Sequence, residues 1–109
     1  MKRNATAIQS LLMAGFMLTA GSAAAQDFGR ATAGQALARQ VCAQCHAVDI
    51  GVPRSPNVDA PRFEAIAKLP GMTSMALNAA LQTSHRSMPN VILDGDARSD
   101  IVAYILSLR

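Results

Sequence analysis

Apolar residues recur at helical spacing in four separate stretches of this chain, and no stretch alternates convincingly in the way of a β-strand. The clearest stripe lies near the C-terminus, where Ile101, Tyr104, Ile105 and Leu108 share one helix face. Shorter patterns predict helices over 33–42, 62–68 and 74–82, with the following residues facing inward: Leu37, Val41, Phe63, Ile66, Ala67, Leu77 and Leu81. The chain is therefore expected to form an all-α domain of about four helices.

Polar residues at the predicted helix starts supply capping groups. Thr32 is expected to cap the first helix, Thr73 the third and Asp94 the last. Asp96 adds a negative charge near the positive end of the last helix, and Arg109 is expected at its negative end.

Three residues depart from the apolar pattern of the first and last helices. Gly34 lies inside the first helix, where glycine costs about 1 kcal/mol relative to alanine. Its expected use is the close approach of another helix. Ser99 and Asp100 are off the stripe of the last helix, so both are expected on the surface.

Two stretches between the predicted helices lack a regular pattern. Residues 48–61 form the first loop, which is broken by Gly51, Pro53, Pro56 and Pro61. Residues 83–93 form the second, which contains His85, Met88 and Pro89.

The N-terminus has the order of features of a secretory signal. A short positive head with Lys2 and Arg3 precedes the uncharged stretch 5–20, and small residues follow up to Ala25. Cleavage after Ala25 would leave a single domain over residues 26–109. The alternative is a membrane anchor, but the apolar stretch is shorter than the roughly 20 residues that span a bilayer.

The charge and size of the chain without the signal limit the classes of partner and cofactor that we expect. Loss of Lys2 and Arg3 lowers the formal net charge from +3 to +1, and no Lys/Arg cluster remains, so no nucleic-acid partner is expected. A domain this small barely offsets its chain entropy and usually contains disulfides, a metal or a cofactor. The chain has only two cysteines, so a large apolar cofactor is a plausible source of core volume.

The cysteines and the adjacent histidine identify that cofactor. Cys42, Cys45 and His46 form C-x-x-C-H, the signature of covalent haem c attachment. Two intervening residues let one helical turn present both thiols to the vinyl groups on one edge of the macrocycle, and His46 then ligates the iron. A thioredoxin-like centre would need a βαβ context, and a zinc site would need four ligands, with only His85 left to add. A disulfide would leave His46 unexplained.

Met88 is the predicted second axial ligand. Pro89 forces the residue before it out of the helical region, so an extended loop would hold the Met88 thioether on the iron. Met72 and Met75 are expected to pack at the start of a helix. His85 is an alternative ligand, a partner for a haem propionate or a surface residue, and Arg86 is a second possible propionate partner.

The order of these features resembles class I monohaem bacterial cytochromes c over nearly all of the mature chain. The motifs that carry the resemblance are C-x-x-C-H, the segment 87–90 around Met88-Pro89 and the segment 100–108. The resemblance implies a small cytochrome c fold, with about four helices wrapped around one covalently attached haem.

The family pattern also assigns roles to individual residues. The family packs its first and last helices across each other, with a glycine at the position of Gly34 and an aromatic residue at that of Tyr104. A proline carbonyl accepts the N–H of the haem-ligating histidine; the residues alone leave Pro56 or Pro61 open, and the family segment corresponds to Pro61. One departure is Ala38, where the family often has Phe or Tyr, so the crossing should lose aromatic contact unless Tyr104 fills the gap.

The predicted function is one-electron transfer in the periplasm by a haem c with iron bound between His46 and Met88, rather than an enzymatic reaction. The partners would be redox proteins that meet the mature, non-membrane-spanning monomer in small, transient contacts with little electrostatic steering. The alternatives are a haem subunit docked on a periplasmic dehydrogenase and an open-site haem enzyme or gas sensor.

Overall fold

Four helices make up the computed structural model, which describes residues 29–83, 85 and 87–109. They are α1 (Ala31–Val41), α2 (Phe63–Ala67), α3 (Ser74–Gln82) and α4 (Gly95–Ser107). No strand occurs within these described ranges, so the all-α prediction is confirmed. The predicted signal over 1–25 and the side chain of Arg86 lie outside the described residues. Among the helices that are described, none has the length and apolar character needed to cross a membrane.

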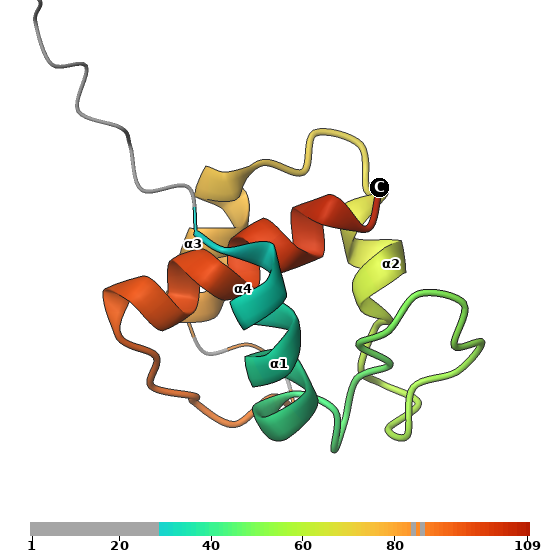
Figure 1. The fold of residues 1–109 in the computed structure, drawn as a ribbon. Helices are drawn as coiled ribbons and strands as arrows, with labels where there is room; N and C mark the ends of the chain where they lie inside the picture. The colour runs from blue at the N-terminus through green and yellow to red at the C-terminus, as the bar shows by residue number, and fades with distance from the viewer. Residues whose placement is uncertain (1–28, 84, 86) are drawn as a thin grey trace, which may run out of the picture.

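The crossing of α1 over α4 is the main contact of the fold (Figure 1). Gly34 permits it, because a Cβ added there would lie 1.9 Å from the carbonyl oxygen of Asp100. Gly29, just before α1, is equally tight, with Ser99 backbone atoms 2.1 Å from an added Cβ. The role predicted for Gly34 is confirmed, whereas Gly29 had no signal in the sequence.

The core lies between α4 and the other three helices. All four residues of the predicted stripe, Ile101, Tyr104, Ile105 and Leu108, are buried. Phe63, Ala67 and Leu77 join them from α2 and α3, as predicted. Ala38 has no exposed surface, although the family often has an aromatic residue there. Tyr104 lies against α1 at Gly34 through its Cβ, while its ring, with its centroid 6.4 Å from that of Phe63, makes its aromatic contact with α2.

Two of the three predicted caps are confirmed. The Thr73 hydroxyl accepts from the Ala76 N–H at 3.1 Å, and the Asp94 carboxylate accepts from the Ala97 N–H at 2.8 Å. The Thr32 cap is wrong, because α1 begins at Ala31 with Arg30 in the capping position and no side-chain cap.

Asp100 was predicted on the surface, and this is also wrong. The residue is only 8% exposed, because the start of α1 packs over it. Its carboxylate accepts the Arg30 backbone N–H at 2.5 Å and lies 3.3 Å from the Arg30 guanidinium. A side chain on α4 therefore binds the first turn of α1, which no side chain of α1 itself caps.

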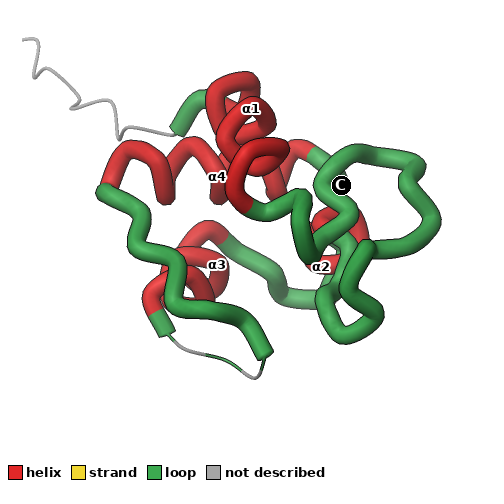
Figure 2. Tube along the Cα trace, turned by 90° about the horizontal axis from the view of Figure 1, so that it is seen from below, coloured by secondary structure: helices red, strands yellow, loops and turns green. Residues whose placement is uncertain are grey.

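Figure 2 shows the two long loops outside the α1–α4 crossing, one running from α1 to α2 and the other from α3 to α4. The loop between α1 and α2 is fixed by backbone bonds, from the Asn57 N–H to the Cys45 carbonyl at 3.1 Å and from the Phe63 N–H to the Ala47 carbonyl at 3.0 Å. At the C-terminus, the Arg109 guanidinium donates to the Met72 carbonyl, which joins the end of the chain to the start of α3.

Candidate functional site

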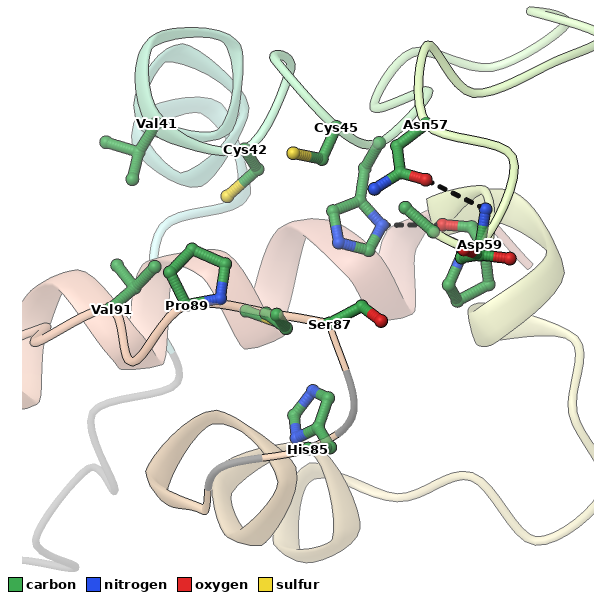
Figure 3. Close-up of a pocket in the computed structure, with 13 residues that line it drawn as sticks. Val41, Cys42, Cys45, Asn57, Asp59, His85, Ser87, Pro89 and Val91 are labelled. Carbon is green, nitrogen blue, oxygen red and sulfur yellow. Dashed lines mark hydrogen bonds between the residues drawn. The ribbon is translucent and has the colours of Figure 1, made fainter.

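A cavity with a largely apolar lining opens where the two loops face the C-terminal end of α1 (Figure 3). Its empty volume is about 650 Å³, including the open mouth. The lining comes from three parts of the chain, namely Val41, Cys42, Cys45 and His46; Asn57, Asp59, Ala60 and Pro61; and His85, Ser87, Met88, Pro89 and Val91. All four residues that the sequence predicted as cofactor ligands are therefore in one cavity.

The two cysteines lie on a tight turn at the end of α1. The Cys42 N–H still bonds to the Ala38 carbonyl at 2.8 Å, and the Cys45 and His46 N–H groups both turn back to the Cys42 carbonyl, at 3.1 and 2.9 Å. Both thiols are free and point into the cavity (Figure 3). Burial raises the pKa of the Cys42 thiol, so it stays protonated at neutral pH.

His46 is fixed in orientation by its outer ring nitrogen. Its Nδ1 lies 2.6 Å from the carbonyl oxygen of Pro61, and because a carbonyl only accepts, Nδ1 carries the proton. In the neutral imidazole Nε2 is then the nitrogen with the lone pair that a metal binds. The Phe63 ring, with its centroid 5.4 Å away, supports the imidazole from the side. The structure thus selects Pro61 rather than Pro56 as the acceptor.

Met88 lies on the wall that also contains His85, Ser87, Pro89 and Val91. The other two candidate methionines do not line the cavity, since Met72 packs against the hydrophobic core and Met75 is 81% exposed. Core packing was therefore the right expectation for Met72 and the wrong one for Met75, whose side chain points away from the core.

The residue before Met88 has an unusual backbone. Ser87 has a φ of 66°, the left-handed region that favours glycine, and the Met88 N–H bonds to the His85 carbonyl at 3.1 Å. These features describe a tight turn that leads directly into Met88-Pro89. A non-glycine residue in this region costs about 1–2 kcal/mol, and such strain is concentrated at functional sites.

His85 also lines the cavity, although its ring is largely exposed. Its Nδ1–H donates to the Thr83 carbonyl at 2.9 Å. Two imidazoles and one thioether are therefore present at the cavity together with the two thiols.

Comparisons with known proteins identify the family of the chain. The cytochrome c family profile matches residues 31–109. The chain belongs to the cytochrome c family. It is 37% identical to the cytochrome c-552 of Bradyrhizobium diazoefficiens over 91 residues, which cover 84% of each chain. No solved structure matches the chain with statistical significance.

A cytochrome c binds haem c covalently and carries electrons through its iron, and the cavity fits that group. Apolar residues such as Val41, Pro89 and Val91 can contact a flat apolar macrocycle. The thiols are on one wall, and His46 presents an unprotonated nitrogen. This donor set of two thiols, imidazole and thioether matches the chemistry of haem c attachment.

A polar cluster behind the attachment turn was not predicted from the sequence. The buried Tyr104 hydroxyl donates to the Val48 carbonyl at 2.8 Å. Next to it, the Asp49 carboxylate accepts from the Arg39 guanidinium at 2.8 Å and from the Gln35 amide at 3.1 Å. The hydrogen bond from Arg39 holds the pKa of Asp49 below its usual value, while burial raises the pKa of Tyr104. The cluster joins α1 and α4 to the residues that follow His46.

Two further contacts fix the loop around the attachment turn. The Ser55 hydroxyl accepts from the Ala47 N–H at 3.0 Å, and Asn57 bonds back to Cys45 as described above. Their partners are about eight to twelve residues away in loop segments, where no periodic pattern in the sequence indicates them.

Proposed function

We propose that this cytochrome c is a periplasmic one-electron carrier whose haem is held by thioether bonds to Cys42 and Cys45, with His46 and Met88 as the axial ligands. The observation that supports this most is the meeting of all four side chains at one apolar cavity, with His46 Nδ1 hydrogen-bonded to Pro61. The haem iron supplies the one-electron chemistry by cycling between its ferrous and ferric states.

The residues around the cavity are suited to hold His46 and Met88 as the axial ligands. The bond to Pro61 and the contact with Phe63 keep the His46 ring in one orientation. Met88 is the methionine that lines the cavity, and a Met/His pair raises the reduction potential of a haem. With both axial positions filled by side chains, no substrate has access to the metal, which favours electron transfer over an enzymatic reaction.

Export to the periplasm is proposed from the N-terminal pattern. The positive head, apolar stretch and small residues up to Ala25 form a cleavable signal, so the mature protein begins at Gln26. Haem c attachment through free thiols fits an exported protein in which no other cysteine competes.

The partners are redox proteins that approach the cavity mouth. Among the described lining residues, Asp59 is the one acidic or basic side chain apart from the histidines, and apolar residues dominate the rest. This weakly charged rim favours short-lived contacts whose rates depend little on salt. The mature protein is proposed to act as a monomer.

A mass spectrum of the exported protein tests the attachment and the processing together. The expected mass is that of residues 26–109 plus one haem, with neither Cys42 nor Cys45 accessible to an alkylating reagent. A colourless protein with both sulfurs alkylated in a host that matures cytochromes c would overturn the proposal.

The axial ligand is tested by absorption in the oxidised state. The wild type is expected to show the near-infrared band of a Met–iron bond, and Met88→Ala to lose it. Met72→Ala and Met75→Ala are matched controls that keep the band, because neither side chain lines the cavity. Absence of the band from the wild type would favour an open-site haem enzyme or gas sensor instead.

A further inference from the structure

The cavity contains one imidazole that the proposed electron carrier does not use. His85 lines the same cavity as His46 and Met88. Figure 3 shows its ring pointing from the end of α3 towards the segment with Ser87, while the thiols of Cys42 and Cys45 point towards that segment from the other side.

The hydrogen bond of the His85 ring occupies Nδ1 and leaves Nε2 as the nitrogen that can face a metal. Its Nδ1–H donates to the Thr83 carbonyl at 2.9 Å, and a carbonyl cannot donate in return. In the neutral imidazole the proton therefore sits on Nδ1, and Nε2 has the lone pair. The Nδ1 of His46 is likewise bonded to the Pro61 carbonyl, so Nε2 is the free ring nitrogen of both histidines at the cavity.

His85 and Met88 are held close together by a single turn. The Met88 N–H bonds to the His85 carbonyl at 3.1 Å, and residues paired in this way have Cα atoms within about 7 Å. Ser87, with its left-handed φ of 66°, lies inside this turn. Both side chains therefore line the same cavity from one short segment.

We propose that His85 is a reserve sixth ligand, which binds the haem iron through Nε2 whenever Met88 dissociates. The inference rests on the proposed His46/Met88 ligation. The exchange breaks one Fe–S bond and forms one Fe–N bond. It transfers no electron, and the hydrogen on Nδ1 stays in its bond to the Thr83 carbonyl while Nε2 provides the lone pair. The resulting bis-histidine form has a lower reduction potential, because the Met ligand that raises it is gone. The cavity thus supports two states with different electron affinity.

The test compares the ferric spectra of Met88→Ala and the double variant Met88→Ala/His85→Ala. Met88→Ala is expected to remain low-spin, with the absorption and EPR signals of two nitrogen ligands. The double variant is expected to be high-spin. His85→Ala alone is the matched control and keeps the Met–iron band of the wild type.

Circular dichroism shows whether the variants are folded, and added imidazole measures the competition for the sixth position. It should return the double variant to the low-spin state, and its apparent affinity should be at least about tenfold weaker for Met88→Ala, in which His85 occupies the position. High-spin spectra in both variants with equal imidazole affinities would overturn the proposal. Low-spin spectra in both would do so too, since another group would then be the ligand. A wild type without the Met–iron band would instead overturn the Met88 assignment, so the two failures are distinguishable.

Discussion

The Tyr104 hydroxyl donates to the carbonyl oxygen of Val48 at 2.8 Å, and so α4 is bonded to the chain two residues after His46. The hydroxyl is buried and lies on the only tyrosine of the chain. This bond connects the helix crossing at the core to the loop that forms one wall of the cavity.

Tyr104→Phe removes this bond and leaves the ring in place. The expected result is a loss of about 1–2 kcal/mol in the free energy of unfolding, because the buried Val48 carbonyl loses its partner. Denaturant unfolding followed by circular dichroism measures it. Ser107→Ala is the control, because the Ser107 hydroxyl bonds to the Tyr104 carbonyl within its own helix, and it should change stability by less than about 0.5 kcal/mol. Equal losses in the two variants would contradict the role of the bond.

Gly34→Ala is expected to destabilise the protein by about 2–4 kcal/mol. The added Cβ would meet the Asp100 backbone at 1.9 Å, so α1 and α4 must separate. Thermal unfolding gives the measurement. Gly95→Ala is the matched control in α4, since no atom lies within 4 Å of an added Cβ there, and it should be neutral or slightly stabilising. A neutral Gly34→Ala would show that the crossing is not tight.

Ser87→Gly and Ser87→Ala should differ in stability. Glycine tolerates the φ of 66° that strains serine and alanine alike, so Ser87→Gly is expected to be more stable than Ser87→Ala by about 1 kcal/mol. Chemical denaturation of the two oxidised proteins under the same conditions makes the comparison. An alanine variant as stable as the glycine variant would mean that the turn before Met88 is not strained.

The acid dependence of stability should be steeper in the wild type than in Asp49→Asn. Arg39 lowers the pKa of Asp49 in the folded state below 3.8, its unperturbed value. A carboxylate with a lowered folded pKa stabilises the protein above the unfolded pKa, and this contribution is lost as the pH falls through the folded pKa. The unfolding midpoint measured from about pH 6 to pH 2 should therefore fall less in Asp49→Asn.

A double-mutant cycle with Arg39→Gln tests whether Arg39 causes the effect of Asp49 on the acid dependence of stability. In the Arg39→Gln background, Asp49→Asn should alter the acid dependence much less than in the wild type, since the largest cause of the shift is already removed. Because the pair is largely exposed, the effect on stability at neutral pH is expected to be small. Identical pH profiles in all four proteins would contradict the assignment.

The helices could be predicted because their signals are local. The stripe of Ile101, Tyr104, Ile105 and Leu108 repeats at the helical period, and Thr73 and Asp94 cap the turn that directly follows them. The resemblance to cytochromes c also indicated Pro61 before any coordinates. These features depend on residues near one another in the chain or on a motif with fixed spacing.

The errors and omissions arose where the partner is distant in the chain. Asp100 lies off the apolar stripe of its own helix, so the sequence predicts a surface position. In the fold it is buried because the start of α1, with Arg30 from 70 residues earlier in the chain, packs against it. Thr32 is a suitable capping residue for a helix that begins at residue 33, but the helix begins two residues earlier, at Ala31. The hydrogen bond from the Tyr104 hydroxyl to the Val48 carbonyl joins residues 56 positions apart, so it likewise could not be predicted from a local pattern.

The cavity is built unequally, since both thiols and His46 come from one five-residue turn, whereas Met88 comes from a loop more than forty residues further along. If the thioethers form as proposed, the turn keeps the prosthetic group tethered on its own. The bond between Met88 and the iron can then break and form again while the haem stays attached to Cys42 and Cys45. Retention of the haem therefore does not depend on the stability of its sixth ligand.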